Sequence, residues 1–332
     1  MKKSLIALAV LGSVAGVAQA QSSVTLYGIV DVYLGSSKSG IGASSVTRLD
    51  SGGFNGSRFG LKGSEDLGGG LKAVFALEQG FSADTGVANT FNGASTSFNR
   101  QSYVGLAGGF GTVTFGNVWS SMDDVLGASN AAFDSVFSPA GYVAAVNGSY
   151  VDRPRNAIKY QSNDFGGFSA GFTHGLDENT TANTDVTDFS LSYAAGPVAA
   201  NLAYQVQNGV VVPGFVNDLK LTHLGGSYDL GVAKILASVG NAKYGSFKTN
   251  DYQVGVDVPL SPALTLSASY AMSDDNAAAG DSERAGFGIA VEYKLSKRTK
   301  VYGGVVSTKD EDAAGVKTDE NRLYAVGIQH RF

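Results

Sequence analysis

Hydrophobic and polar residues alternate along most of this chain, with the period of two that is typical of β-strands. Among residues 24–34 the even positions hold valine, leucine or glycine, whereas the odd positions include Thr25, Asp31 and two tyrosines. The segments 71–81 and 321–332 repeat this alternation. A polar face buried in an apolar core would cost several kcal/mol for each unpaired group. The pattern therefore predicts strands with one apolar face and one face in contact with water.

The connectors between these segments alternate between short and long. The short ones carry residues that favour tight turns, as at 66–69 and 195–197, and the long ones are polar, as at 273–283 and 309–320. We predict sixteen strands, which begin near residues 23, 57, 70, 99, 111, 154, 167, 186, 197, 219, 231, 250, 263, 284, 299 and 321. An even number of antiparallel strands closes without open edges, and sixteen strands leave an aqueous channel. The expected fold is all-β, a 16-stranded antiparallel transmembrane β-barrel forming one domain over residues 21–332.

The composition favours a membrane barrel over a soluble β-protein. The chain has 45 glycines, 15 tyrosines and 18 phenylalanines, but only 6 prolines and no cysteine. Without cysteine there is neither a disulfide framework nor a thiolate metal site. No apolar run is long enough for a transmembrane helix, which needs roughly 20 residues. A membrane barrel needs only one apolar and one polar face along each strand, and this requirement fits the sequence.

The N-terminus has the features of a secretory signal peptide. Lys2 and Lys3 precede a short apolar stretch at 5–17, and residues 18–20 (AQA) offer a small-x-small cleavage site. We predict that residues 1–20 are removed and that the exported chain begins at Gln21. An uncleaved N-terminal anchor helix is the alternative.

One connector, residues 119–153, is longer than any other. Loops of this length are usually functional or disordered. Its apolar residues, which include Trp119, Leu126, Phe133 and Phe137, indicate that it packs against another part of the protein. We therefore predict that it folds into the lumen and narrows the channel, and a flexible external loop is the alternative.

The chain resembles the general porins of Gram-negative bacteria, most of all those of β-proteobacteria, in motifs spread over its whole length. The motifs are SVTLYG (23–28), SRFGLKGSEDLG (57–68), RQSYVGL (100–106) and GIQHRF (327–332). This resemblance implies a sixteen-stranded barrel in the outer membrane, a homotrimer, an inward-folded third external loop, and passive diffusion of ions and small hydrophilic molecules. The final Phe332 resembles the terminal signal that the barrel-assembly machinery reads.

In such porins a ladder of arginines on the barrel wall faces acidic groups on the inward-folded loop. By position, the matching arginines here are Arg58, Arg100 and Arg155, and Arg153 lies nearby. Enteric porins add a lysine on the first strand, where this chain has Ile29, so the resemblance implies a smaller positive cluster. A charge on the lipid face costs about 2–4 kcal/mol near the midplane, which favours inward-pointing arginines. Girdle arginines that reach toward lipid headgroups are the alternative.

The acids that would face these arginines lie on the long connector. Asp134 is the candidate at its tip, and Asp123 and Asp124 are the candidates on its stem. Three arginines against one or two acids would leave a positive constriction, and rings of Arg or Lys favour anions in narrow pores. We therefore predict a weak anion preference that fades at high salt, because salt screens these charges.

Other chemistry finds little support in the sequence. Residues 167–171 (GFSAG) match the nucleophile elbow of hydrolases, but that motif needs a strand-to-helix turn and here it lies within an alternating strand. The histidines His174, His223 and His330 are too widely spaced to suggest a triad or a zinc site. We expect no catalytic, cofactor-binding or metal site. A barrel enzyme and a non-porous structural barrel remain the alternative classes.

The net charge of −5 argues against nucleic-acid binding. Many acids fall in the long connectors that would lie outside the cell, where divalent cations would bridge them to lipopolysaccharide phosphates. This bridging is a hypothesis, since solvated loops are commonly acidic. The acids concerned are Asp274, Asp275, Asp281, Glu283, Asp310, Glu311, Asp312, Asp319 and Glu320.

Overall fold

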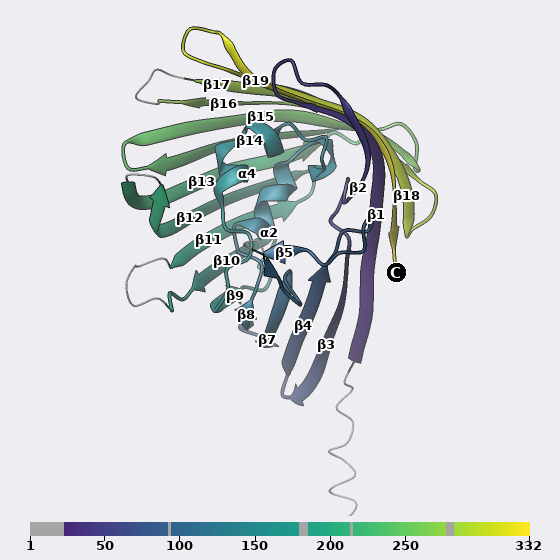
Figure 1. The fold of residues 1–332 in the computed structure, drawn as a ribbon. Helices are drawn as coiled ribbons and strands as arrows, with labels where there is room; N and C mark the ends of the chain where they lie inside the picture. Colours follow the sequence, from purple (N-terminus) through teal and green to yellow (C-terminus); the bar gives the residue numbers. More distant parts are fainter. Residues whose placement is uncertain (1–22, 92–93, 179–184, 213–214, 277–281) are drawn as a thin grey trace, which may run out of the picture.

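The computed structural model describes residues 23–91, 94–178, 185–212, 215–276 and 282–332. The predicted signal peptide at 1–20 lies outside these ranges. The described chain forms one barrel with a long segment folded into its interior (Figure 1). No helix in these ranges is long and apolar enough to cross a membrane.

The wall of the barrel consists of long strands joined in chain order. Its strands are β1 (Ser23–Ser39), β2 (Val46–Ser51), β3 (Arg58–Gly68), β4 (Leu71–Gly80), β7 (Gln101–Gly108), β8 (Gly111–Asn117), β9 (Ala157–Gln161), β10 (Phe168–Gly175), β11 (Val186–Ala195), β12 (Val198–Val212), β13 (Phe215–Asp229), β14 (Lys234–Tyr244), β15 (Phe247–Pro259), β16 (Leu264–Asp275), β17 (Glu283–Lys294), β18 (Thr299–Glu311) and β19 (Lys317–Arg331). The short strands β5 (Thr90–Phe91) and β6 (Ala94–Ser95) pair with each other in a separate two-stranded sheet.

The sheet is antiparallel and closed. Strand β19 pairs with β1, so that Ile29 lies opposite Arg331 and Ser39 lies opposite Asn321. The strands β2 and β3 lie end to end along β1, β2 beside its second half and β3 beside its first half. The 17 strands of this sheet therefore occupy sixteen positions around the barrel, which confirms the predicted fold.

The strand limits differ most from the prediction in three places. Residues 46–51, which the prediction left in a connector, form β2. Strand β13 begins at Phe215 rather than near 219, and β19 begins at Lys317 rather than near 321. These two starts do not alternate, because β13 begins with the apolar pair Phe215 and Val216 and β19 begins with the polar run KTDE at 317–320. Alternation of residue types therefore does not mark where these strands begin.

The two faces of the wall have opposite character. Outward side chains such as Val24, Leu26 and Val326 are more than 60 % exposed. Inward side chains are polar, and some of them, such as Gln205 and Thr173, are fully buried because the inserted segment covers them. An apolar exterior around a polar interior is the arrangement of a barrel in a membrane.

The inserted segment crosses the inner wall from β10, where Ser121 N donates to Thr173 Oγ1, to β18, where Phe137 packs on Tyr302. It contains α2 (Asp123–Leu126), η1 (Gly127–Ser129), η2 (Ala132–Asp134), α3 (Ala140–Val143) and α4 (Ala145–Ser149), and α2 and α4 are visible inside the barrel in Figure 1. Its apolar side chains Met122, Val125, Leu126 and Val146 pack on Ala203, Leu221 and Ala242 of the wall. The wall leaves room for the segment with small residues. At Gly288, for example, a Cβ atom would overlap the carbonyl oxygen of Phe137.

Candidate pore constriction

Acidic side chains of the wall hold the backbone of the inserted segment. Met122 N donates to Asp188 Oδ1 at 3.2 Å. Ala145 N and Val146 N donate to the two carboxylate oxygens of Asp251 at 3.0 and 2.8 Å. Helix α4 has no capping side chain of its own, so Asp251 of β15 satisfies its first N–H groups. These contacts give three backbone donors of the segment partners on the barrel wall.

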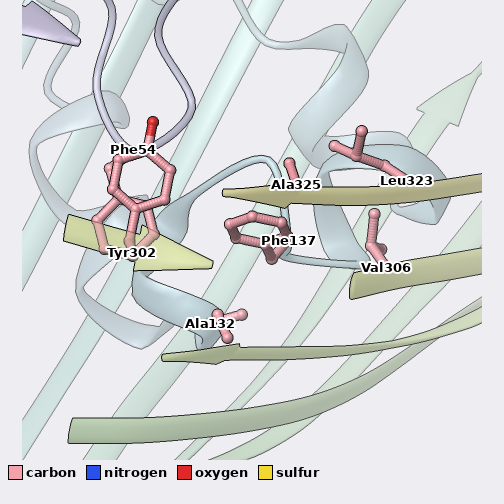
Figure 2. Close-up of a cluster of buried hydrophobic side chains, with 8 residues drawn as sticks. Phe54, Ala132, Phe137, Tyr302, Val306, Leu323 and Ala325 are labelled. Atoms are coloured by element: carbon pink, nitrogen blue, oxygen red, sulfur yellow. The ribbon is translucent and has the colours of Figure 1, made fainter. Parts of the chain in front are cut away.

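The tip of the segment is strained and is fixed by aromatic packing. Residues 132–134 have positive φ angles of 55, 62 and 47°, a conformation that costs roughly 1–3 kcal/mol per non-glycine residue. The ring of Phe54 stacks on Tyr302 at 4.1 Å between centroids and lies 5.1 Å from Phe133. Phe137 contacts both Phe54 and Tyr302 edge-on, as Figure 2 shows. This cluster fixes the position of the tip.

A cavity of about 390 Å³ lies beside the tip. Its charged lining residues are Arg58, Arg100, Asp123 and Asp134, all of which were candidates from the sequence. The remaining lining is formed by Trp119, Ser135, Val136 and the segment 52–56. The structure therefore gathers two wall arginines and two loop acids around one space.

A buried carboxylate lies behind the two wall arginines. Arg100 Nε donates to Glu78 Oε1 at 2.6 Å, and Arg58 Nη1 lies 4.0 Å from the same oxygen. Glu78 is 3 % exposed and receives a further hydrogen bond from the Tyr27 hydroxyl at 2.9 Å. The cavity lining includes both arginines but not Glu78, so a solute there would meet the arginine side chains rather than this carboxylate.

The candidates Arg153 and Arg155 lie in different surroundings. The guanidinium carbon of Arg153 is 4.0 Å from the centre of the Trp119 ring, and that of Arg100 is 5.0 Å from it, so both cations contact one indole. Arg153 Nη1 also pairs with Asp152 Oδ2 at 2.7 Å. Arg155 is exposed and is not among the residues that line the cavity.

Asp123 has the most perturbed carboxyl group of the inserted segment. The Tyr150 hydroxyl donates to Asp123 Oδ1 at 2.7 Å. Burial raises the pKa of Asp123 to about 6, and the carboxylates of Asp152 and Asp124 act in the same direction. The Tyr150 hydrogen bond and the charge of Arg153 oppose this shift. The negative charge of this group is therefore sensitive to mild acid.

The other two loop acids occupy separate places. Asp134 accepts a hydrogen bond from the Asn130 side chain, and burial raises its pKa. Asp124 pairs with Lys159 of β9, and both line a second cavity of about 450 Å³. Burial raises the pKa of Asp124 while the Lys159 charge lowers it. Asp124 is thus not among the lining residues of the arginine cavity.

Besides the segment 52–56, the sequence did not single out Glu78, Trp119 or Asp152 as site residues. Glu78 stands on the polar face of the alternating segment 71–81, so its inward direction was recognisable. Its pairing with Arg58 and Arg100 depends on strand register, which alternation does not reveal.

The three histidines and the GFSAG motif, which the sequence offered as possible chemical groups, have structural surroundings. His223 bonds to Ser129 Oγ at 3.0 Å, His174 to Thr187 Oγ1 at 2.8 Å and His330 to Thr299 Oγ1 at 2.9 Å. The GFSAG motif runs into β10, a strand paired on both sides, and no helix follows it there. Within the described residues, no three His, Asp or Glu side chains are arranged to hold a metal ion.

Comparison with known proteins gives consistent matches over the whole chain. The family model described as Gram-negative porin matches residues 7–313. Outer membrane porin protein 32 of Delftia acidovorans is 37% identical over 99% of this chain and 95% of its own length. An outer membrane porin protein of Bordetella pertussis is 30% identical over 100% of both chains. The solved anion-selective porin from Comamonas acidovorans has a TM-score of 0.80 at 31% identity, over 94% of this chain and 100% of that one.

Proposed function

We propose a function for this chain, which belongs to the Gram-negative porin family. The cavity beside the loop tip is the constriction of its channel and favours anions weakly. As a porin with a closed barrel, the protein is a channel of the outer membrane for passive diffusion of ions and small hydrophilic solutes. The proposal assigns Arg58, Arg100 and Arg153 as the cations of the constriction, and Asp123 and Asp134 as the acids facing them.

The observation that carries the anion preference is the placement of charge around the cavity. Arg58 and Arg100 line the cavity, although Arg100 is only 8 % exposed, whereas Glu78, whose carboxylate partly neutralises them, is 3 % exposed and is not among the lining residues. The lining acids Asp123 and Asp134 both have raised pKa values, so they lose their negative charge at a higher pH than an ordinary aspartate does. Positive groups in a narrow pore favour anions. The similar solved porin that is described as anion-selective supports the same sign.

The test of this proposal is the reversal potential across a potassium chloride gradient in a planar bilayer. The parent should prefer chloride weakly, and the Arg58→Ser, Arg100→Ser double variant should lower or reverse that preference while raising conductance. Arg48→Ser is the matched control, because Arg48 lies on β2 with an exposed side chain and pairs with Asp50 at 3.8 Å. A cation-selective parent that ignores the double substitution would show that these arginines do not line the constriction.

The proposal extends to processing and assembly. We infer cleavage after residue 20, a homotrimer, insertion by the barrel-assembly machinery through Phe332, and contact of the outer loops with lipopolysaccharide. The relatives are named as porins, so the proposed role is that of a channel rather than an enzyme. The described outer acids include several that pair with lysines, such as Glu320 with Lys317 and Glu311 with Lys309. Bridging by divalent cations would therefore compete with these ion pairs.

A further inference from the structure

A second segment, residues 52–57, also enters the barrel. It separates β2 from β3, which pair with β1 on either side of Val30 and Asp31. Its Phe54 is 3 % exposed and belongs to the aromatic cluster at the loop tip. Val136 N of the inserted loop donates to Gly53 O at 3.0 Å. Residues 52–56 therefore join the loop tip and line the arginine cavity with it.

The carboxylate of Asp31 holds this segment in place. Asp31 lies on the inward face of β1 and its exposure is 0 %. Its hydrogen-bond donors are Gly53 N (3.0 Å), Phe54 N (3.1 Å), Asn55 N (2.9 Å), Gln329 Nε2 (2.7 Å) and the Tyr302 hydroxyl. A buried carboxylate is tolerated when it is hydrogen-bonded in this way, and without it the buried donors would be unsatisfied. The position of the segment therefore depends on Asp31.

The segment in turn orients two arginines. Arg58 Nε donates to Gly56 O at 3.0 Å, and Arg331 Nη2 donates to Asn55 Oδ1 at 3.1 Å. Both contacts are made with neutral oxygens, which fix the side chains without cancelling their charge. If the segment moved, both guanidinium groups would lose an acceptor that directs them.

Strand register places Arg331 beside Arg58 on the lumen face. Ile29 of β1 pairs with Arg58 on one side and with Arg331 on the other. Directly paired residues of antiparallel strands point to the same face of the sheet. Gln329, which has the same orientation as Arg331, is buried inside the barrel. The row Arg331, Ile29 and Arg58 thus carries two cations at one height of the wall.

We propose that residues 52–57 form a second wall of the constriction, and that Asp31 is the positioning residue that holds Arg58 and Arg331 toward the passing solute. Arg331 is then a further cation on which ion selectivity depends. This inference rests on the proposed function, that the cavity is the constriction of a weakly anion-preferring channel.

The experiment compares single-channel conductance and reversal potential in Asp31→Asn, Asn55→Ala and the parent. Asp31→Asn replaces one acceptor oxygen by a donor amide among the donors around it, so the segment should move. Conductance should rise and most of the anion component of the reversal potential should be lost. Asn55→Ala removes the acceptor of Arg331 and should lower the reversal potential with a smaller change in conductance. Asp50→Asn, on β2 close to the segment, is the control and should leave both quantities at parental values.

Single channels report only barrels that have folded and inserted. A purely structural role of Asp31 therefore predicts fewer channels with parental conductance and selectivity, and that result would overturn the proposal. If Asp31→Asn yields no channels, Gly53→Ala decides, because its Cβ would overlap the Tyr302 side chain and displace the segment while Asp31 stays. Parental selectivity and conductance in Gly53→Ala would also overturn it. A parent without anion preference would instead refute the proposed function, and the conductance of Asp31→Asn would still test the second wall.

Discussion

Acidification from pH 7.5 to 5 should strengthen the preference of this channel for anions, and Asp123 is the group that we expect to carry the change. Burial is the main cause that raises the pKa of Asp123 from 3.8 to about 6, helped by Asp152 and Asp124 and opposed by Tyr150 and Arg153. With a pKa of about 6, the carboxyl group is about 3% protonated at pH 7.5 and about 90% protonated at pH 5. The cavity therefore loses nearly one negative charge as the pH falls.

The size of the effect follows from the charge lost. An ion that passes about 8 Å from the carboxylate interacts with it by about 0.5 kcal/mol at the dielectric constant of water. Salt reduces this energy further, since the Debye length is about 8 Å at 0.15 M. We therefore expect the ratio of anion to cation permeability to rise roughly 1.5- to 2-fold between pH 7.5 and pH 5.

The assay is the reversal potential in a potassium chloride gradient at several pH values. Asp123→Asn should show, at every pH tested, the selectivity that the parent shows at pH 5. Asp124→Asn is the matched control and should keep the pH dependence, because Asp124 pairs with Lys159 and lines the other cavity. A parent whose selectivity is the same at pH 7.5 and pH 5, or an Asp123→Asn variant that keeps the full change, would refute the reasoning.

Three further predictions concern the inserted loop, the contact of the last residue with β1, and the N-terminus. Gly288→Val places a side chain where the Phe137 carbonyl oxygen lies, so the loop should leave the wall and alter single-channel conductance; parental conductance would contradict this. Deletion of Phe332 removes two backbone hydrogen bonds of 3.1 Å with Gly28 and should reduce the yield of heat-modifiable barrels on gels; a parental yield would count against it. The intact mass of protein from outer membranes should match a chain that begins at Gln21, and a mass that includes residues 1–20 would disprove the cleavage.

The barrel was predictable because alternation is a local signal. The period of two separates the inward from the outward side chains of a strand. The position of Asp31 on the inward, polar face and of Val326 on the outward, apolar face was therefore evident from the sequence. The starts of β13 and β19 were less clear, because β13 begins with the apolar pair 215–216 and β19 with the polar run 317–320, and neither alternates. Segment 52–57 was missed because its glycines look like part of an ordinary connector.

The candidate site was predictable only in part, because it depends on contacts between distant strands. Arg58 and Arg100 were recognised by resemblance, and the structure brings them to one cavity. Their shared partner Glu78 depends on the register of β3, β4 and β7, which no local pattern specifies. The contact of Arg153 with Trp119 likewise depends on how both ends of the inserted loop meet the wall.

The pairing of β1 with β19 has a consequence for biogenesis. It joins the two ends of the exported chain, with Ile29 opposite Arg331, so no shorter piece of the chain is a closed sheet. An incomplete sheet would expose the unpaired backbone groups of its two edge strands. Each such group costs several kcal/mol in hydrocarbon. Contacts between such distant residues also form slowly. We therefore expect insertion to be all-or-none, with the chain kept apart from other unpaired strands in the periplasm until its last residues have been delivered.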